Sequence, residues 1–218
     1  MDTAYLLPAL STLLLGIVTG VIVARFLKKR GYVRIWPNRA SVEPRLEQRF
    51  QNAKKSIFLY GLSFEGTLNS HKDDLVQAIQ RGVEVKILML HYKSKHVEAH
   101  QEFSDRTLKP KLEENVVLRL HDLFYESLTE DDRARLTIRA TNYLPRFSAN
   151  ILDDKDLYIN FYLYKSSASD NPVILINDRE NPAEFKKTKK TLDALFDDPD
   201  NVHITQNGTW KGFDKEVK

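Results

Sequence analysis

Residues 56–90 read SIFLYGLSFEGTLNSHKDDLVQAIQRGVEVKILML. The apolar runs at 56–64 and 83–90 are typical of strands that are buried on both faces. Between them, Leu68, Leu75 and Ile79 recur at helical spacing, and Gly82 follows as a C-terminal helix cap. The pattern predicts a strand–helix–strand unit, in which the two strands are parallel and joined by a right-handed crossover.

Apolar periodicity predicts further elements on both sides of this unit. Helices are expected over 41–55, 94–115, 123–135 and 182–197. Strands are expected over 116–120, 136–141, 147–152, 157–164 and 172–176, with a hairpin turn rich in Asp at 153–156. The polar segment from Asn207 onwards is expected to form a loose tail.

The first residues of the chain have the character of a membrane anchor. No charged side chain occurs from Thr3 to Ala24, and a basic cluster begins at Arg25. Such a run is long enough to cross a bilayer of ~30 Å, and basic residues stay on the cytoplasmic side. We therefore expect one transmembrane helix, with the N-terminus outside and the rest in the cytoplasm, by default at a bacterial inner membrane. Gly16 and Gly20 form a G-x-x-x-G motif that favours close packing of two helices.

Composition narrows the class of protein. Of the 33 basic and 30 acidic residues, six basic residues and one Asp lie in 1–39, so the remainder of the chain is slightly acidic. This distribution favours anionic lipid head groups over nucleic acid as a partner of the basic segment. The chain has no cysteine, which excludes disulfides and thiolate sites. His96 and His100 share a predicted helix face, but no Cys is available and a third ligand would have to come from elsewhere, so neither a metal nor another cofactor is expected.

Residues 45–197 resemble a phospholipase D-like domain. The resemblance rests on the strand ending Leu62–Phe64, the helix through Leu75–Ile79, the segment Arg81–Val83, and the later order of strands around Asp153. It implies an α/β fold: a single phospholipase D-like sandwich with a mixed sheet flanked by helices, here preceded by one transmembrane helix. The chain would divide into an anchor at 1–30, a connector at 31–44, the domain at 45–205 and a polar tail at 206–218.

The motif that carries catalysis in this family is H-x-K-x4-D. With its Asp aligned on Asp153, the His position holds Arg146 and the Lys position holds Ser148. In the family the His attacks phosphorus and the Lys holds phosphate oxygens. Arg has no usable lone pair and Ser supplies no positive charge. The family's Gly-Ser segment is also replaced, by Ile159–Tyr162. The resemblance therefore implies a pseudoenzyme with a degenerate motif.

A second His-x-Lys pair offers an alternative. His91 and Lys93 follow the second strand of the crossover, where open α/β sheets bind ligands, and Lys95 lies close by. His91, Lys93, Lys95 and Arg146 are thus candidates for anion binding, and His91 with Lys93 is the alternative catalytic pair. The segment also fits a solvated basic loop.

The sequence predicts a membrane-anchored, non-catalytic domain that acts in signalling, ligand binding or scaffolding. The family resemblance implies a homodimer. A phosphate-bearing small molecule or a lipid head group is the expected ligand, and nucleic acid is a less favoured partner. An analogy with other anchored sensor domains suggests bacterial stress or defence. The alternative is a membrane-anchored phosphodiesterase or nuclease that uses His91 and Lys93.

Overall fold

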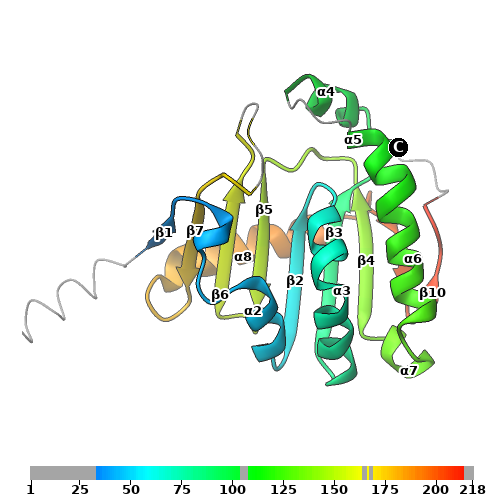
Figure 1. The fold of residues 1–218 in the computed structure, drawn as a ribbon, viewed down its shortest axis with the longest axis horizontal. Helices are drawn as coiled ribbons and strands as arrows, with labels where there is room; N and C mark the ends of the chain where they lie inside the picture. The colour runs from blue at the N-terminus through cyan, green and yellow to red at the C-terminus, as the bar shows by residue number, and fades with distance from the viewer. Residues whose placement is uncertain (1–32, 104–107, 164–165, 167–168, 214–218) are drawn as a thin grey trace, which may run out of the picture.

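The computed structural model describes residues 33–103, 108–163, 166 and 169–213 (Figure 1). A mixed sheet in the order β1-β7-β6-β5-β2-β3-β4-β8 forms the centre of this part of the chain, and β9 pairs with β10 beside it. The predicted transmembrane helix and its Gly16 and Gly20 lie outside the described residues. Among the residues that are described, no helix is long and apolar enough to cross a membrane.

The elements have the following bounds. The strands are β1 (Arg34–Trp36), β2 (Ser56–Gly61), β3 (Glu84–Leu90), β4 (Leu136–Thr141), β5 (Phe147–Leu152), β6 (Asp156–Phe161), β7 (Val173–Asn177), β8 (Val202–His203), β9 (Thr205–Gln206) and β10 (Thr209–Trp210). The helical segments are η1 (Arg39–Ser41), α2 (Leu46–Asn52), α3 (Glu65–Gln80), α4 (His96–Phe103), α5 (Leu108–Pro110), η2 (Lys111–Val116), α6 (Val117–Glu126), α7 (Glu130–Arg133) and α8 (Pro182–Phe196).

The strand–helix–strand unit is confirmed. β2 and β3 are parallel, with Ser56 opposite Glu84 and Gly61 opposite Met89, and α3 connects them. β4 extends the parallel part beyond β3. β5, β6 and β7 continue the sheet on the other side of β2, each antiparallel to its neighbour. The predicted mixed sheet flanked by helices is therefore present.

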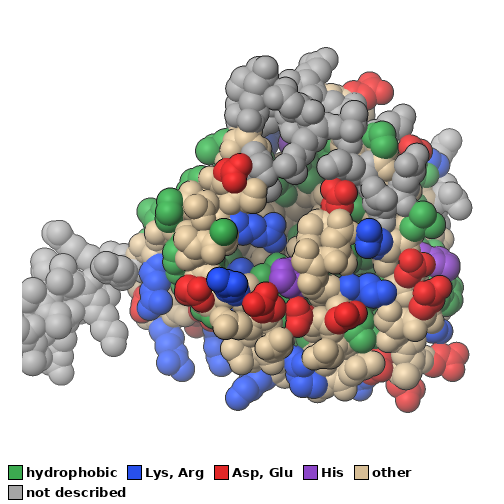
Figure 2. Space-filling model, in the orientation of Figure 1, with side chains coloured by type: hydrophobic (Ala, Val, Ile, Leu, Met, Phe, Trp, Pro, Cys, Tyr) green, Lys and Arg blue, Asp and Glu red, His purple; other side chains and the backbone are tan. Residues whose placement is uncertain are grey.

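Helices cover the two faces of the sheet. In Figure 1, α2, α3 and α6 lie in front of the sheet and α8 crosses behind it. Phe50, Ile57 and Phe124 belong to the large core under the front helices. Phe185 and Phe196 of α8 pack on the rear face in a second cluster. Charged side chains lie on the outer surface. Figure 2 shows basic and acidic side chains interspersed over the front face.

The predicted strand over 116–120 is wrong, because this segment is helical. The buried residues of this region are Val116, Leu120, Leu123 and Phe124, which recur at helical spacing, whereas Leu118 is 60% exposed. The segment reads as a strand only because β-branched and apolar residues are adjacent there. The helix predicted over 123–135 is divided at Ser127–Thr129, where the Thr129 hydroxyl accepts a hydrogen bond from the Asp132 amide and begins α7.

Several boundaries also differ from the prediction. The strand expected over 56–64 ends at Gly61. The helix expected from Ser41 begins at Leu46, because Arg45 is extended and its amide is capped by Gln48. The strand expected to reach Tyr164 ends at Phe161. The tail expected to be loose from Asn207 is folded as far as Phe213, which is buried beside His91 and Tyr92. The domain therefore extends past the expected limit at 205.

Candidate functional site

A small polar cavity lies on the front face of the sheet, at one end of β5 and β6. Ser148 is directly opposite Asn160, and Asn150 is opposite Tyr158, so alternation along the two strands aims these four side chains at the same side. Arg39, Val42 and Arg49, from η1 and α2 and the link between them, cover these side chains. The cavity has a free volume of about 10 Å³, which is room for one water molecule. It is lined by Arg39, Val42, Arg49, Ser148, Asn150, Tyr158, Asn160 and Val173.

Arg49 enters this cavity from α2. The residue is only 6% exposed, and its guanidinium carbon lies 4.1 Å from the centre of the Tyr158 ring. Its Nε and Nη1 have no hydrogen-bond partner among the described residues. Burial, with a smaller contribution from the nearby charge of Arg39, lowers the pKa of Arg49 to about 10. The Arg49 side chain is therefore a buried cation whose Nε and Nη1 donors are unpaired among the described residues.

Arg39 approaches the same cavity from η1. Its Nη2 donates a long hydrogen bond of 3.5 Å to the Thr67 hydroxyl at the start of α3. Burial lowers the pKa of Arg39 as well. No ion pair involving Arg39 or Arg49 is present in the described part of the chain, so both guanidinium groups lie over the cavity without a bound carboxylate.

Tyr162 contacts Ser148, one of the residues that line the cavity. Its hydroxyl accepts a hydrogen bond of 3.1 Å from the Leu62 amide and makes another with the Ser148 side chain. Burial raises the pKa of Tyr162. The fit is tight, because a Cβ added to Gly61 would lie 2.9 Å from the Tyr162 hydroxyl oxygen. The Ser148 hydroxyl is thus held by a phenol, and the cavity lining contains no carboxylate or imidazole that could activate it.

The three predicted motif positions are divided between the two ends of β5. Arg146 is exposed just before the strand, and Ser148 lines the cavity. Asp153 follows the other end, where its carboxylate accepts hydrogen bonds from the amides of Lys54, Lys55 and Ser56 at 2.7–3.1 Å. Desolvation opposes ionisation of Asp153, but these three bonds prevail and lower its pKa. Asp153 therefore anchors the hairpin and lies apart from the cavity.

The segment His91–Lys95 forms a separate feature. His91 is fully buried, its Nδ1 accepts a hydrogen bond of 3.1 Å from the Lys93 amide, and its Nε2 lies 3.2 Å from the Phe213 carbonyl oxygen. These partners assign the proton to Nε2. Burial lowers the pKa of His91. Lys93 and Lys95 are exposed. Within the described residues, no hydrogen bond or ion pair joins this segment to Arg146.

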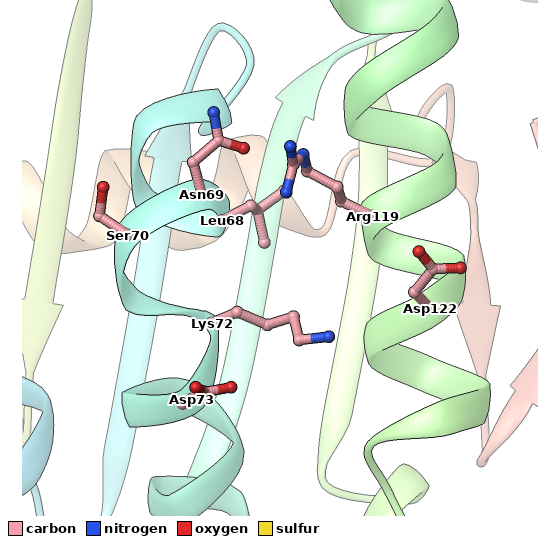
Figure 3. A pocket seen from close by; sticks show the side chains of 7 residues that line it. All are labelled: Leu68, Asn69, Ser70, Lys72, Asp73, Arg119 and Asp122. Carbon is pink, nitrogen blue, oxygen red and sulfur yellow. The ribbon is translucent and has the colours of Figure 1, made fainter.

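A second, open pocket lies between α3 and α6, with a volume of about 260 Å³. The backbone of α3 is kinked beside it, at His71. Figure 3 shows Lys72 reaching from α3 toward α6, and Arg119 reaching from α6 toward α3. Asp73 and Asp122 also line the pocket, so its charges largely balance. The sequence offered no motif for this pocket.

Two residues of the main cavity, Arg39 and Arg49, were missed by sequence reasoning. Arg49 carries a usable signal, because it lies between Leu46 and Phe50 on the buried face of α2. A charged residue on an apolar helix face needs a partner or a function. Arg39 carries no such signal, since it belongs to the short connector and reaches the sheet only through the fold.

Comparison with solved structures identifies proteins whose fold is similar to that of this chain. No family model and no curated protein matches the chain. Among solved structures, phosphatidylserine synthase from Haemophilus influenzae aligns with a TM-score of 0.54 and 11% identity, over 85% of this chain and 42% of the synthase. The chain thus spans less than half of the synthase. This likeness shows the fold, and it supports the phospholipase D-like architecture expected from the sequence.

Two further structures align less closely. Nuc from Salmonella typhimurium, described as a phospholipase D family member, has a TM-score of 0.47 and 13% identity, over 80% of this chain and 99% of Nuc. The archaeal chromatin protein TrmBL2, which shows a novel mode of DNA binding, has a TM-score of 0.47 and 15% identity, over 91% of this chain and 70% of its own. At this similarity neither protein informs the activity of the chain. What the comparisons show for this chain is therefore a fold shared with the synthase, in support of a phospholipase D-like architecture.

Proposed function

We propose that this chain is a non-hydrolytic phospholipase D-like domain that binds a ligand at a membrane for signalling or scaffolding. The observation that carries the proposal is the chemistry of the cavity on β5 and β6. Its lining combines two arginines with amides and hydroxyls and includes no His, Lys or carboxylate. Such a site supplies positive charge and hydrogen bonds but neither an activated nucleophile nor a general base.

The geometry of His91 disfavours the alternative enzyme. Nucleophilic attack on phosphorus needs an accessible nitrogen lone pair. In His91 the lone pair of Nδ1 accepts the Lys93 amide, and Nε2 is directed at the Phe213 carbonyl. The ring is also fully buried. A hydrolytic role for His91 would require the C-terminal segment to leave and the ring to turn outward.

Turnover of bis-p-nitrophenyl phosphate and of single-stranded DNA by the full chain in mild detergent tests this proposal. We expect no hydrolysis above the detergent blank. Because a His91 variant can lose its fold, the matched change is Lys93→Ala, whose side chain is exposed. Hydrolysis by the wild type that Lys93→Ala abolishes would establish the alternative enzyme.

We further propose that residues 3–24 anchor the domain and that Gly16 and Gly20 pair two anchors in a homodimer. The absence of charge in this run and the small-residue spacing support this proposal. The full chain should remain in the membrane fraction after carbonate extraction, and Gly16→Leu with Gly20→Leu should remove crosslinked dimers. Release by carbonate would exclude the anchor, and dimers that persist in the double variant would exclude this interface.

A further inference from the structure

We infer that Arg39 and Arg49 form the two cationic arms of a binding site for one phosphate-type oxyanion. The site is the cavity over β5 and β6, and neither arginine belongs to the H-x-K-x4-D pattern. The inference rests on the proposed function, because it names the ligand that a non-hydrolytic cavity would hold. Its test below is independent of hydrolysis.

The first argument is the state of Arg49. A charged group is rarely buried without a counter-charge, because desolvation is costly. Arg49 is 6% exposed, and two of its three guanidinium nitrogens have no hydrogen-bond partner among the described residues. The Tyr158 ring beneath it supplies only a quadrupole. Buried polar atoms that lack a protein partner in a native fold usually hold a water or an ion.

The second argument is the pairing of two cations. Arg39 lies close enough to lower the pKa of Arg49 by repulsion. Two groups raise the pKa of Arg49: the Tyr158 phenol, whose effect is larger than that of Arg39, and Asp156, whose effect is the smallest. The Asp156 carboxylate already accepts a hydrogen bond from Asn177. An anion between the two guanidinium groups would convert this repulsion into two attractive interactions.

The third argument is the lining of the cavity. Opposite the arginines, Asn150 presents an amide that can donate to oxygen, and Ser148 presents a hydroxyl that is already hydrogen-bonded to Tyr162. The cavity lining includes no carboxylate that would repel an anion. Guanidinium groups match the planar and multidentate contacts that phosphate oxygens offer, which favours an oxyanion over a halide.

The size of the cavity determines how the ligand enters. A free volume of about 10 Å³ admits one water, so an oxyanion needs Arg39 to move outward. Arg39 is the side chain suited to this movement, because it is half-buried and its hydrogen bond to Thr67 is 3.5 Å long. Arg49 remains stacked on Tyr158 as the fixed arm.

Thermal unfolding of the full chain in mild detergent, at constant ionic strength set with sodium chloride, tests the site. The probes are inorganic phosphate, glycerol 3-phosphate and dihexanoyl phosphatidic acid. We expect at least one probe to raise Tm by an amount that follows ln(1 + [L]/Kd), about 5–10 °C at a hundredfold excess over Kd. Arg49→Met and, separately, Arg39→Met should each weaken that binding by at least about tenfold. The exposed control Arg179→Met should respond as the wild type does.

The outcomes distinguish a free oxyanion from a head group as the ligand. They also distinguish failure of the binding site from failure of the proposed non-hydrolytic function. A logarithmic rise of Tm with inorganic phosphate identifies a free oxyanion, and such a rise with an ester alone identifies a head group; both support the site. A wild type whose Tm rises with none of the probes overturns it. So does a response that Arg49→Met and Arg39→Met both retain. Because hydrolysis is measured separately, an enzyme that binds phosphate through these arginines would overturn the proposed function and leave the site standing.

Discussion

Replacing Phe213 with Ala should lower the free energy of unfolding by about 3–5 kcal/mol, as is usual for a fully buried Phe. Phe213 is 4% exposed, and its ring contacts Trp210, Tyr92 and His91 at centroid distances near 6 Å. The loss should appear as a Tm about 10 °C lower in thermal unfolding of the full chain. This result would establish that the C-terminal segment belongs to the folded domain.

The matched control for this change is Phe161→Ala. Phe161 lies at the end of β6 and is 36% exposed, so its removal should cost clearly less. If the Tm of the Phe213→Ala variant is no lower than that of the Phe161→Ala variant, the C-terminal segment is the loose tail that the sequence predicts.

The contact between His91 and Phe213 also makes the free energy of unfolding depend on pH. Burial lowers the pKa of His91, and the Phe213 carbonyl opposes this shift. The unfolded chain therefore binds a proton at His91 more readily than the folded chain does. The contribution of neutral His91 is complete above the unfolded pKa of about 6.5 and is lost as the pH falls below it toward the lower folded value. His91→Asn should flatten this part of a plot of Tm against pH.

Asp153→Asn should lower the free energy of unfolding by about 2–3 kcal/mol, because one carboxylate holds three backbone amides. An Asn side chain keeps one acceptor and brings an N–H group toward the amides. The lowered pKa of Asp153 adds a pH signature. Its stabilisation is complete above the unfolded pKa near 3.8 and is lost as the pH falls through the lower folded pKa. Urea unfolding at pH 7 measures the main effect.

Asp154→Asn is the control for the hairpin. Asp153 and Asp154 both have positive φ, 52° and 54°, and Asn tolerates that conformation as well as Asp does. Asp154 instead makes an exposed contact of 3.5 Å with Lys189, worth less than about 1 kcal/mol. Equal losses in the two variants would mean that the turn conformation, rather than the three amide bonds, makes Asp153 important.

The central sheet could be predicted because its strands are buried on both faces. β2 and β3 appear in the sequence as short, dense apolar runs, β4 alternates apolar and polar residues, and the helix between β2 and β3 has a clear periodicity and a glycine cap. Predictions were wrong where the residues fit both a strand and a helix. The beginning of α6 resembles a strand over five residues and shows its helical period only when the window reaches Phe124.

The candidate site could be predicted only in part. The family motif directed attention to Ser148, and the sequence predicts that the motif's nucleophile is missing. The cationic arms were not visible, because Arg39 and Arg49 reach Ser148 from about 100 residues earlier in the chain, and no local spacing encodes that contact. Likewise, nothing in the polar C-terminal stretch indicated that Phe213 would bury His91.

The most direct test of the central claim, that this phospholipase D-like fold lacks a working nucleophile, is a search for a covalent phosphoenzyme. The full chain would be mixed with bis-p-nitrophenyl phosphate, quenched in base to preserve any phosphohistidine, and analysed by intact mass and peptide mapping. We expect the mass of the protein to be unchanged at every time point. A phosphoryl adduct on His91, or on any other histidine, would contradict the account and establish an enzyme with a relocated nucleophile.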